Sequence, residues 1–165
     1  MLVWEWNTNA PVKWIADPSM YSMPSVTVHP SGDYWAGQGL DNTIHIYGVS
    51  NNFRATKKKF TGHKIDGYAC QIGFSPDGRC VCIVAMFSCS SYHVNAVNSR
   101  VVMGIRFTMS GDSDGRLFFW DYRTTKLYRK MKTHADGPCM GAIWHPTEPS
   151  GVATCGWDGL VKLWD

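Results

Sequence analysis

The stretch TCGWDGLVKLWD, at residues 154–165, follows the same pattern as SGDSDGRLFFWD, at residues 110–121. In each, an Asp-Gly pair separates a short run that begins with a hydroxyl residue from an apolar run that ends in Trp-Asp. Glycine readily adopts a positive φ, so an Asp-Gly pair in this setting is typical of a tight β-hairpin turn. The two stretches therefore predict a repeated unit of strand, turn and strand.

A third, more divergent copy of the pattern occurs earlier in the chain, and the spacing of the copies defines a period. The three copies are Gly37, Asp41 and Tyr47; Ser110, Asp114 and Trp120; and Thr154, Asp158 and Trp164. Trp4 fits the end of a preceding copy. The intervals between the four aromatic residues are 43, 73 and 44 residues, which indicates a period near 44 with one interval that is too long.

The excess lies in residues 82–108, a segment of 27 residues that does not fit the repeat. Without it, FSPDGRCV and MSGDSDGRLFFWD adjoin and the middle copy regains the period. The segment is mostly apolar and contains no Asp, Glu, Lys or Pro, whereas surface loops are polar and rich in turn residues. Two interpretations stay open: an insertion specific to this lineage, or translated sequence of a retained intron.

The composition favours an all-β globular protein. Of the 165 residues, 44% are hydrophobic and 13% aromatic, and the aromatic residues lie mostly beside β-branched and turn residues, as they do in strands. The net charge of +3 is too weak to indicate nucleic-acid binding by itself. The six Cys lack the spacing of a disulfide framework, which favours reduced thiols and hence the cytosol or the nucleus.

Neither a membrane nor export is expected from the sequence. The longest apolar run, CVCIVAMF at residues 80–87, is far shorter than the ~20 residues of a membrane-spanning helix. The first residues, MLVWEWN, lack the basic start of a signal peptide.

The period, the Asp-Gly turns and the Trp-Asp endings resemble the WD-repeat family, in which each repeat supplies four antiparallel strands of a β-propeller. The resemblance implies an all-β, partial propeller of about three four-stranded blades from a ring of seven. The expected divisions are the end of a preceding blade at 1–6, a divergent repeat at 7–48, a repeat interrupted by 82–108 at 49–121, and a C-terminal repeat at 122–165 that ends at its third strand. The strand that closes the ring and the earlier blades are expected upstream of Met1.

The same resemblance implies a set of structural residues. In WD repeats, a His that precedes the first strand, a Ser or Thr, the turn Asp and the Trp form a buried hydrogen-bonded tetrad. The expected tetrads are His63, Ser110, Asp114 and Trp120, and His134, Thr154, Asp158 and Trp164. In the divergent repeat Gly37 and Tyr47 replace the hydroxyl residue and the Trp, and Asp17 stands in place of the His, so no tetrad is expected there.

An enzymatic interpretation of the tetrad that contains His63 is weaker than the structural one. Ser110, His63 and Asp114 are the residue types of a hydrolase triad. However, the same set recurs in the next repeat with a Thr, no G-x-S-x-G elbow surrounds Ser110, and a triad has no use for the indole. We therefore expect a protein that is not an enzyme and that has no small-molecule substrate.

A zinc site is also disfavoured. The candidate ligands are Cys80, Cys82, Cys89 and His93, but their spacing matches no usual structural zinc site. We expect neither a metal nor any other cofactor.

The run FRATKKKF at residues 53–60 places cations beside aromatic residues, as some nucleic-acid contacts do. Its cations are Arg54, Lys57, Lys58 and Lys59, and a second such run is YRTTKLYRKMK at 122–132. The interpretation we favour is an outer strand, on which Lys side chains cover apolar surface and protect the edge of the sheet. The sequence alone does not support direct RNA contact.

Outside residues 82–108 the chain also resembles the WD-repeat splicing factors, in stretches that the repeat pattern does not require, such as GYACQ, TTKLY and CGWDGLVKLWD. That resemblance implies a nuclear, non-enzymatic scaffold of the spliceosome, which contacts spliceosomal proteins around the second catalytic step, exon ligation. The alternative is a WD-repeat adaptor in another complex, such as chromatin or ubiquitin-ligase machinery.

Overall fold

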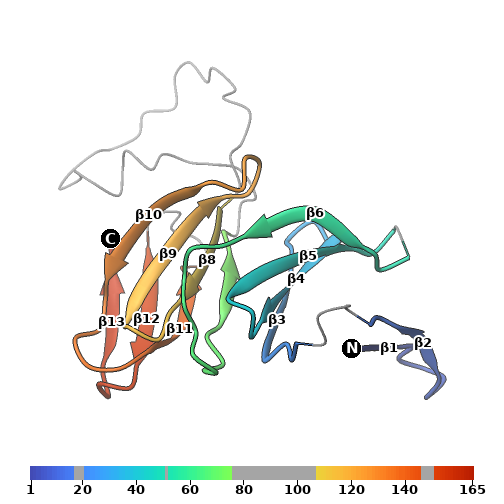
Figure 1. Ribbon diagram of the computed structural model, residues 1–165, viewed down its shortest axis with the longest axis horizontal. Helices are drawn as coiled ribbons and strands as arrows, with labels where there is room; N and C mark the ends of the chain where they lie inside the picture. Colours follow the sequence, from blue (N-terminus) through green and yellow to red (C-terminus); the bar gives the residue numbers. More distant parts are fainter. Residues whose placement is uncertain (17–20, 51, 76–106, 146–150) are drawn as a thin grey trace.

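The computed structural model describes residues 1–16, 21–50, 52–75, 107–145 and 151–165, which form antiparallel β-sheets and no helix (Figure 1). Three sheets follow one another along the chain and are arranged as an open fan, with a two-stranded hairpin beside the first sheet. The expected all-β, partial propeller is therefore confirmed.

Each sheet is a blade whose strands are hydrogen-bonded in the order in which they occur in the chain. The first blade consists of β3 (Ser25–Val28), β4 (Tyr34–Gly39), β5 (Thr43–Gly48) and β6 (Ala55–Phe60). The second consists of β7 (Ile72–Phe74), β8 (Phe107–Gly111), β9 (Arg116–Asp121) and β10 (Leu127–Lys132). The third consists of β11 (Cys139–Trp144), β12 (Val152–Gly156) and β13 (Val161–Trp164). The separate hairpin consists of β1 (Leu2–Trp4) and β2 (Pro11–Trp14).

The repeated sequence pattern forms the hairpin between the second and third strand of each blade. Gly115 and Gly159, the glycines of the two Asp-Gly pairs, have φ of 69° and 74° in these turns. Asn42 takes their place in the first blade with a φ of 60°. Asparagine tolerates this left-handed conformation better than most residues, which explains why the divergent repeat keeps the same turn.

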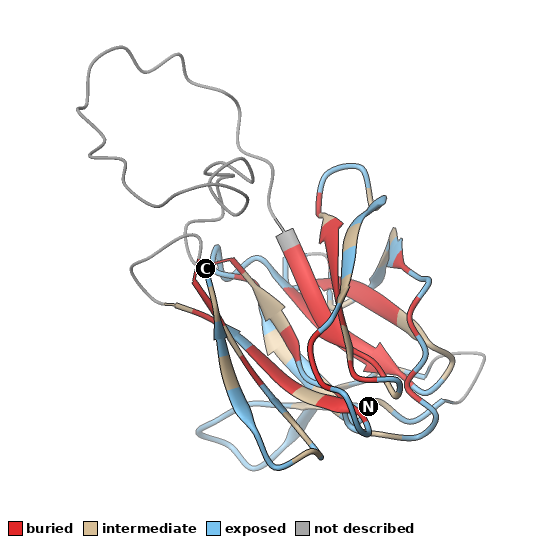
Figure 2. Cartoon of the chain, turned by 90° about the vertical axis from the view of Figure 1, so that its left-hand side faces the viewer, coloured by how far each residue is buried: buried red, intermediate tan, exposed pale blue. Residues whose placement is uncertain are grey.

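The core lies between the blades, in two layers. Strand β9 supplies both, because successive side chains of a strand point to opposite faces of the sheet. Phe118 and Trp120 pack against the first blade, whereas Leu117 and Phe119 pack against the third. This explains why residues 117–120 of this strand, LFFW, are an uninterrupted apolar run, and Figure 2 shows that buried residues concentrate in the strands inside the fan.

The first strands of the three blades converge on one side of the fan. Residues of β3, β7 and β11 together line a pocket of about 680 Å³ there. The last strands, β6 and β10, are the outer strands of their sheets, as expected for the two lysine-rich runs.

The segment expected to interrupt the second repeat, 82–108, ends two residues earlier than the repeat alignment predicts. Strand β8 begins at Phe107, and Thr108 is paired with Phe74 of β7 and with Trp120 of β9. Two residues of the segment 82–108 are therefore part of the blade. Residues 82–106 lie outside the described part of the chain, as do residues 76–81 before them.

Loss of a core side chain between two blades should destabilise the whole fan. The Trp120 side chain is fully buried, and its ring lies 6.1 Å from that of Phe60 in the first blade. We expect Trp120→Ala to lower the free energy of unfolding by about 3 to 5 kcal/mol, measured by urea denaturation. The control Ile143→Ala, at a side chain that is 68% exposed, should change it by no more than about 0.5 kcal/mol. Equal effects of the two substitutions would contradict a core between the blades.

Candidate functional site

The third blade joins its four expected tetrad residues in one chain of hydrogen bonds. His134 lies between β10 and β11, and its Nδ1 is 2.8 Å from Oδ1 of Asp158 in the hairpin turn. Its Nε2 is 3.0 Å from Oγ1 of Thr154, which in turn accepts a hydrogen bond of 2.9 Å from Nε1 of Trp164. Because a carboxylate accepts hydrogen bonds, Nδ1 of His134 carries the proton and Nε2 accepts from the Thr154 hydroxyl.

The carboxylate of Asp158 is held by more than the histidine. It also accepts the backbone N–H of Leu160 at 3.2 Å and Nζ of Lys162 at 3.4 Å. Burial acts to raise the pKa of Asp158, but the hydrogen bonds from His134, Leu160 and Lys162 outweigh it and keep the pKa below its usual value. The network therefore fixes the hairpin turn to the loop that enters the blade.

The second blade arranges the equivalent residues differently. Nε2 of His63 donates to Oε1 of Gln38 at 2.8 Å, and Oγ of Ser110 donates to the same oxygen at 3.4 Å. Gln38 belongs to β4 of the first blade, so this network crosses from one blade to the next. Nε1 of Trp120 donates to the backbone carbonyl of Thr61 at 2.9 Å.

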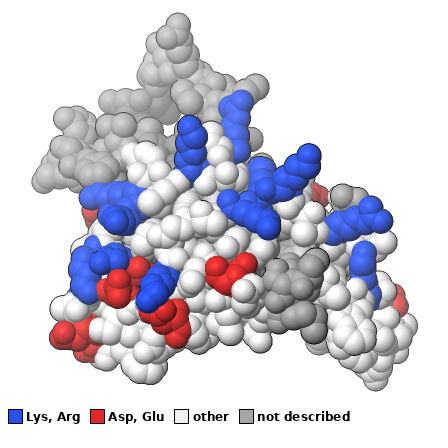
Figure 3. All heavy atoms as spheres, in the orientation of Figure 1, with Lys and Arg blue, Asp and Glu red and all other residues white. Residues whose placement is uncertain are grey.

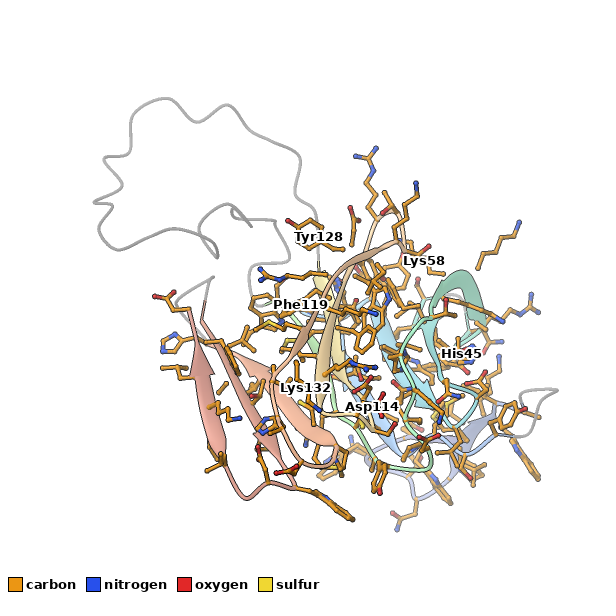
Figure 4. All side chains as sticks on the ribbon, turned by 60° about the vertical axis from the view of Figure 1, so that its left-hand side comes forward. His45, Lys58, Asp114, Phe119, Tyr128 and Lys132 are labelled. Carbon is orange, nitrogen blue, oxygen red and sulfur yellow. The ribbon has the colours of Figure 1, made fainter. Side chains whose placement is uncertain are left out.

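Asp114, the turn aspartate of the second blade, points away from this network. Its side chain is 52% exposed, and its Oδ2 lies 2.8 Å from the guanidinium of Arg116. Nζ of Lys132 donates to its backbone carbonyl, and both residues are labelled in Figure 4. The tetrad expected from His63, Ser110, Asp114 and Trp120 is therefore not formed.

Asp112 takes the place of the turn carboxylate. Its side chain is 1% exposed, and its Oδ1 accepts the backbone N–H groups of Asp114 at 3.1 Å and Arg116 at 2.7 Å. Burial raises the pKa of the Asp112 carboxyl, although these hydrogen bonds oppose the effect.

The reason for the rearrangement is the Cβ atom of Asp112. The other two blades have glycine at the position equivalent to 112, namely Gly39 and Gly156. A Cβ at Gly39 would lie 2.3 Å from Oδ1 of Asp41, and a Cβ at Gly156 would lie 2.5 Å from Cγ of His134. A side chain at position 112 therefore excludes both an inward-pointing turn aspartate and a histidine placed as His134 is.

The sequence carried a signal for one of these residues but not for the other. Alignment of the three copies puts Asp112 where the other copies have glycine, and this departure indicates a different turn. No comparable signal marks Gln38, because its partners belong to the next blade and are distant in the sequence.

The first blade has its own arrangement at the turn. Oδ1 of Asp41 accepts the backbone N–H of Thr43 at 3.1 Å, and its Oδ2 lies 3.1 Å from Nε2 of His45. Tyr47, which replaces the Trp, stacks on Trp35 with ring centroids 4.0 Å apart. Asp17, which stands in place of the His, lies outside the described residues.

These geometries do not form a catalytic centre. Ser110 is bonded to Gln38 and to the backbone carbonyl of Gly111, whereas a hydrolase triad requires a hydrogen bond from the serine to the histidine. Burial raises the pKa of Cys70 to about 12 and that of Cys139 to about 11, which keeps both thiols protonated and unreactive.

The four residues considered as zinc ligands, Cys80, Cys82, Cys89 and His93, lie outside the described residues. Within the described ranges, no group of His, Cys, Asp and Glu side chains is arranged to hold a metal ion. The described ranges also contain no helix that could span a membrane.

The four basic residues expected on an outer strand do not act as one group. Arg54, Lys57 and Lys59 are exposed, whereas Lys58 is partly buried. Nζ of Lys58 donates to the backbone carbonyl of Tyr122 at 3.1 Å and lies 4.0 Å from the centroid of the Tyr122 ring. Lys58 thus joins the first two blades. In Figure 3 most of the visible Lys and Arg side chains lie along the upper side of the fan, over β6 and β10.

The comparisons with known proteins agree with this geometry. Residues 125–165 match the family model "WD domain, G-beta repeat". The structure is similar to the β-propeller domain of Cps50 (Swd1) from Myceliophteria thermophila, with a TM-score of 0.59 and 19% identity over 86% of this chain and 35% of that one. The chain is a partial WD-repeat β-propeller.

The sequence of this WD-repeat chain is similar to named splicing factors over nearly its whole length. It is 47% identical to pre-mRNA-processing factor 17 of Homo sapiens over 99% of this chain and 24% of the relative. It is 34% identical to the factor of that name from Saccharomyces cerevisiae, over 99% of this chain and 30% of the relative. The chain thus spans about a quarter to a third of the length of these relatives, and its resemblance to WD-repeat splicing factors is confirmed.

The exchange of roles between two aspartates can be tested directly in this WD-repeat chain. We expect Asp112→Ala to lower the free energy of unfolding by about 1 to 3 kcal/mol, because the backbone N–H groups of Asp114 and Arg116 lose their acceptor in the turn. The matched control Asp114→Ala removes an exposed carboxylate and should change it by no more than about 0.5 kcal/mol. Urea denaturation at neutral pH measures both. The reverse order of effects would show that the turn has the tetrad geometry of the third blade after all.

His63 should make the stability of the chain sensitive to acid. Burial lowers its pKa from 6.5 to about 4, against the opposing charge of Asp41, and its Nδ1 has no hydrogen-bond partner among the described residues. The unfolded chain binds a proton near pH 6.5 and the folded chain only near pH 4, so stability is lost as the pH falls through that window. The loss between pH 7.5 and pH 4.5 should be about 2 to 3 kcal/mol.

Urea denaturation at the two pH values measures this loss. His63→Gln should remove most of it, whereas His145→Gln, at a partly exposed position, should leave it unchanged. An equal loss in all three proteins would assign the acid sensitivity to other groups.

Proposed function

We propose that this WD-repeat protein is a non-enzymatic, nuclear component of the spliceosome, which holds other spliceosomal proteins in place around exon ligation, the second catalytic step. The observation that carries the proposal is the 47% identity to human pre-mRNA-processing factor 17 over 99% of the chain. The repeat pattern alone accounts for a match over one repeat, such as that of the family model over residues 125–165, but not for this identity over nearly the whole chain.

The role of a scaffold is supported by where the polar side chains are engaged. His134, Thr154 and Asp158 of the third blade bond to one another, Asp112 of the second bonds to its own turn, and His63 bonds to Gln38 of the first blade; these bonds help to position the blades. What the chain offers to other molecules is the surface of its blades and outer strands. A propeller acts through such surfaces, and the fold by itself does not specify which molecules it contacts.

Association with the splicing machinery is the first test of the proposal. The tagged full-length chain, expressed in cells and purified from nuclear extract, should recover small nuclear RNAs and spliceosomal proteins. The Trp120→Ala variant, at equal expression, should recover them poorly because its blades are not held together. Recovery of a chromatin or ubiquitin-ligase complex without small nuclear RNAs would favour the adaptor interpretation instead.

The step in splicing is tested by depletion. An extract depleted of the endogenous protein should accumulate the cleaved 5′ exon and the lariat intermediate, which are the products of the first step. Adding the purified protein back should restore ligated exons. Accumulation of uncut pre-mRNA would place the protein before the first step and contradict this part of the proposal.

A further inference from the structure

A pocket of about 580 Å³ opens between the first and second blades, on the side of their outer strands. We call it the interblade pocket. Ile46 and Tyr122, which are 1% and 5% exposed, line its apolar part, together with the partly exposed ring of Tyr34. Lys57, Lys58 and Arg123 supply its charges. A pocket that combines buried apolar surface with a few fixed polar groups is the usual form of a binding site.

Lys58 belongs to the framework of the pocket. Its ammonium group lies over the ring of Tyr122 and donates to the carbonyl of the same residue, so it ties β6 to the chain that follows β9. Tyr122 is packed from other sides by Phe74 and His29, whose ring centroids lie 5.8 Å and 5.0 Å away. The floor of the pocket is therefore rigid before any ligand binds.

Lys57 and Arg123 provide the charge that is available to a ligand. Both are exposed, and within the described part of the chain their side chains form no ion pair and no hydrogen bond. The carboxylate of the neighbouring Asp121 is engaged by the backbone N–H groups of Arg123 and Thr124, at 2.7 Å and 2.9 Å. No Asp or Glu lines the pocket, so its potential is positive.

We propose that the interblade pocket binds an acidic segment of a partner protein, with one apolar side chain over Ile46 and Tyr122 and flanking carboxylates on Lys57 and Arg123. Arg123 can hold a carboxylate through two parallel N–H groups, and Lys57 adds a second charge on the adjoining blade. The proposal rests on the proposed role as a protein-binding scaffold, but not on the step in splicing.

A peptide fits this pocket better than single-stranded RNA does. RNA without sequence preference is bound by aromatic rings with an open face, on which bases stack. The ring of Tyr122 is buried and covered by the Lys58 ammonium, and Tyr34 presents a ring that already contacts His29 edge-on at 6.2 Å. Buried aliphatic and aromatic surface below two cations suits an apolar side chain between carboxylates.

The probe is a short fluorescein-labelled peptide of Glu residues around a central Phe, titrated with the purified full chain and followed by fluorescence anisotropy. Two matched peptides, one with Gln in place of every Glu and one with Gly in place of the Phe, should each bind at least about tenfold more weakly. Arg123→Glu and Lys57→Glu should each weaken binding of the probe about tenfold or more. Lys130→Glu, the same charge change on an exposed part of β10 outside the pocket, should alter it less than about threefold.

Thermal unfolding of each variant checks that the fold is intact, and two substitutions on different blades keep the test valid if one of them fails to fold. Equal weakening by Lys130→Glu would mean general attraction to a basic surface and would overturn the proposal. So would tighter binding of a labelled oligouridylate that Arg123→Glu abolishes, because that result assigns the pocket to RNA. Peptide binding uses purified protein, so its failure is separate from a failure to recover small nuclear RNAs.

Discussion

Each blade has two faces, and each face can be buried only against a neighbouring blade. This constraint decides what the sequence must supply. Strand β9 buries Phe118 and Trp120 on one side and Leu117 and Phe119 on the other, so the four middle residues of this strand are all apolar. Where the burial is one-sided, the pattern alternates, as in the exposed and partly buried positions of β13. The hydrophobic effect therefore acts between repeats more than within them.

The same constraint brings polar groups into the layers between blades, where a group without a hydrogen-bond partner costs free energy. In the third blade His134, Asp158 and Thr154 satisfy one another within a single repeat. In the second blade Asp112 occupies the space that such a set needs, and His63 and Ser110 turn to Gln38 of the first blade. One Cβ atom thus converts a network inside a blade into a network between blades. Repeats of similar sequence need not share one hydrogen-bond pattern.

The sequence was sufficient for the features that depend on local spacing. The Asp-Gly turns, the two strands that flank each of them and the tetrad residues of the third blade follow from short patterns that repeat with a fixed period. The features that escaped it depend on contacts across the chain. Gln38 meets His63 only after two blades have packed, and Phe107 and Thr108 join β8 because its neighbours β7 and β9 pair with them. An alignment of repeats cannot place the start of β8, because the sequence before this strand is as apolar as the strand itself.

The distribution of charge follows from the position of strands within the blades. Outer strands have an unpaired edge, and lysines on β6 and β10 make that edge unfavourable for pairing with other chains. A surface protected in this way attracts acidic molecules without distinguishing among them, since exposed charges are screened and weakly directional. Discrimination requires apolar surface at a fixed distance from the charge. Between the first two blades the ring of Tyr122, which packs against Phe74, lies beneath Lys58 of β6, so the junction of two repeats offers the combination of charge and apolar surface that a single repeat lacks.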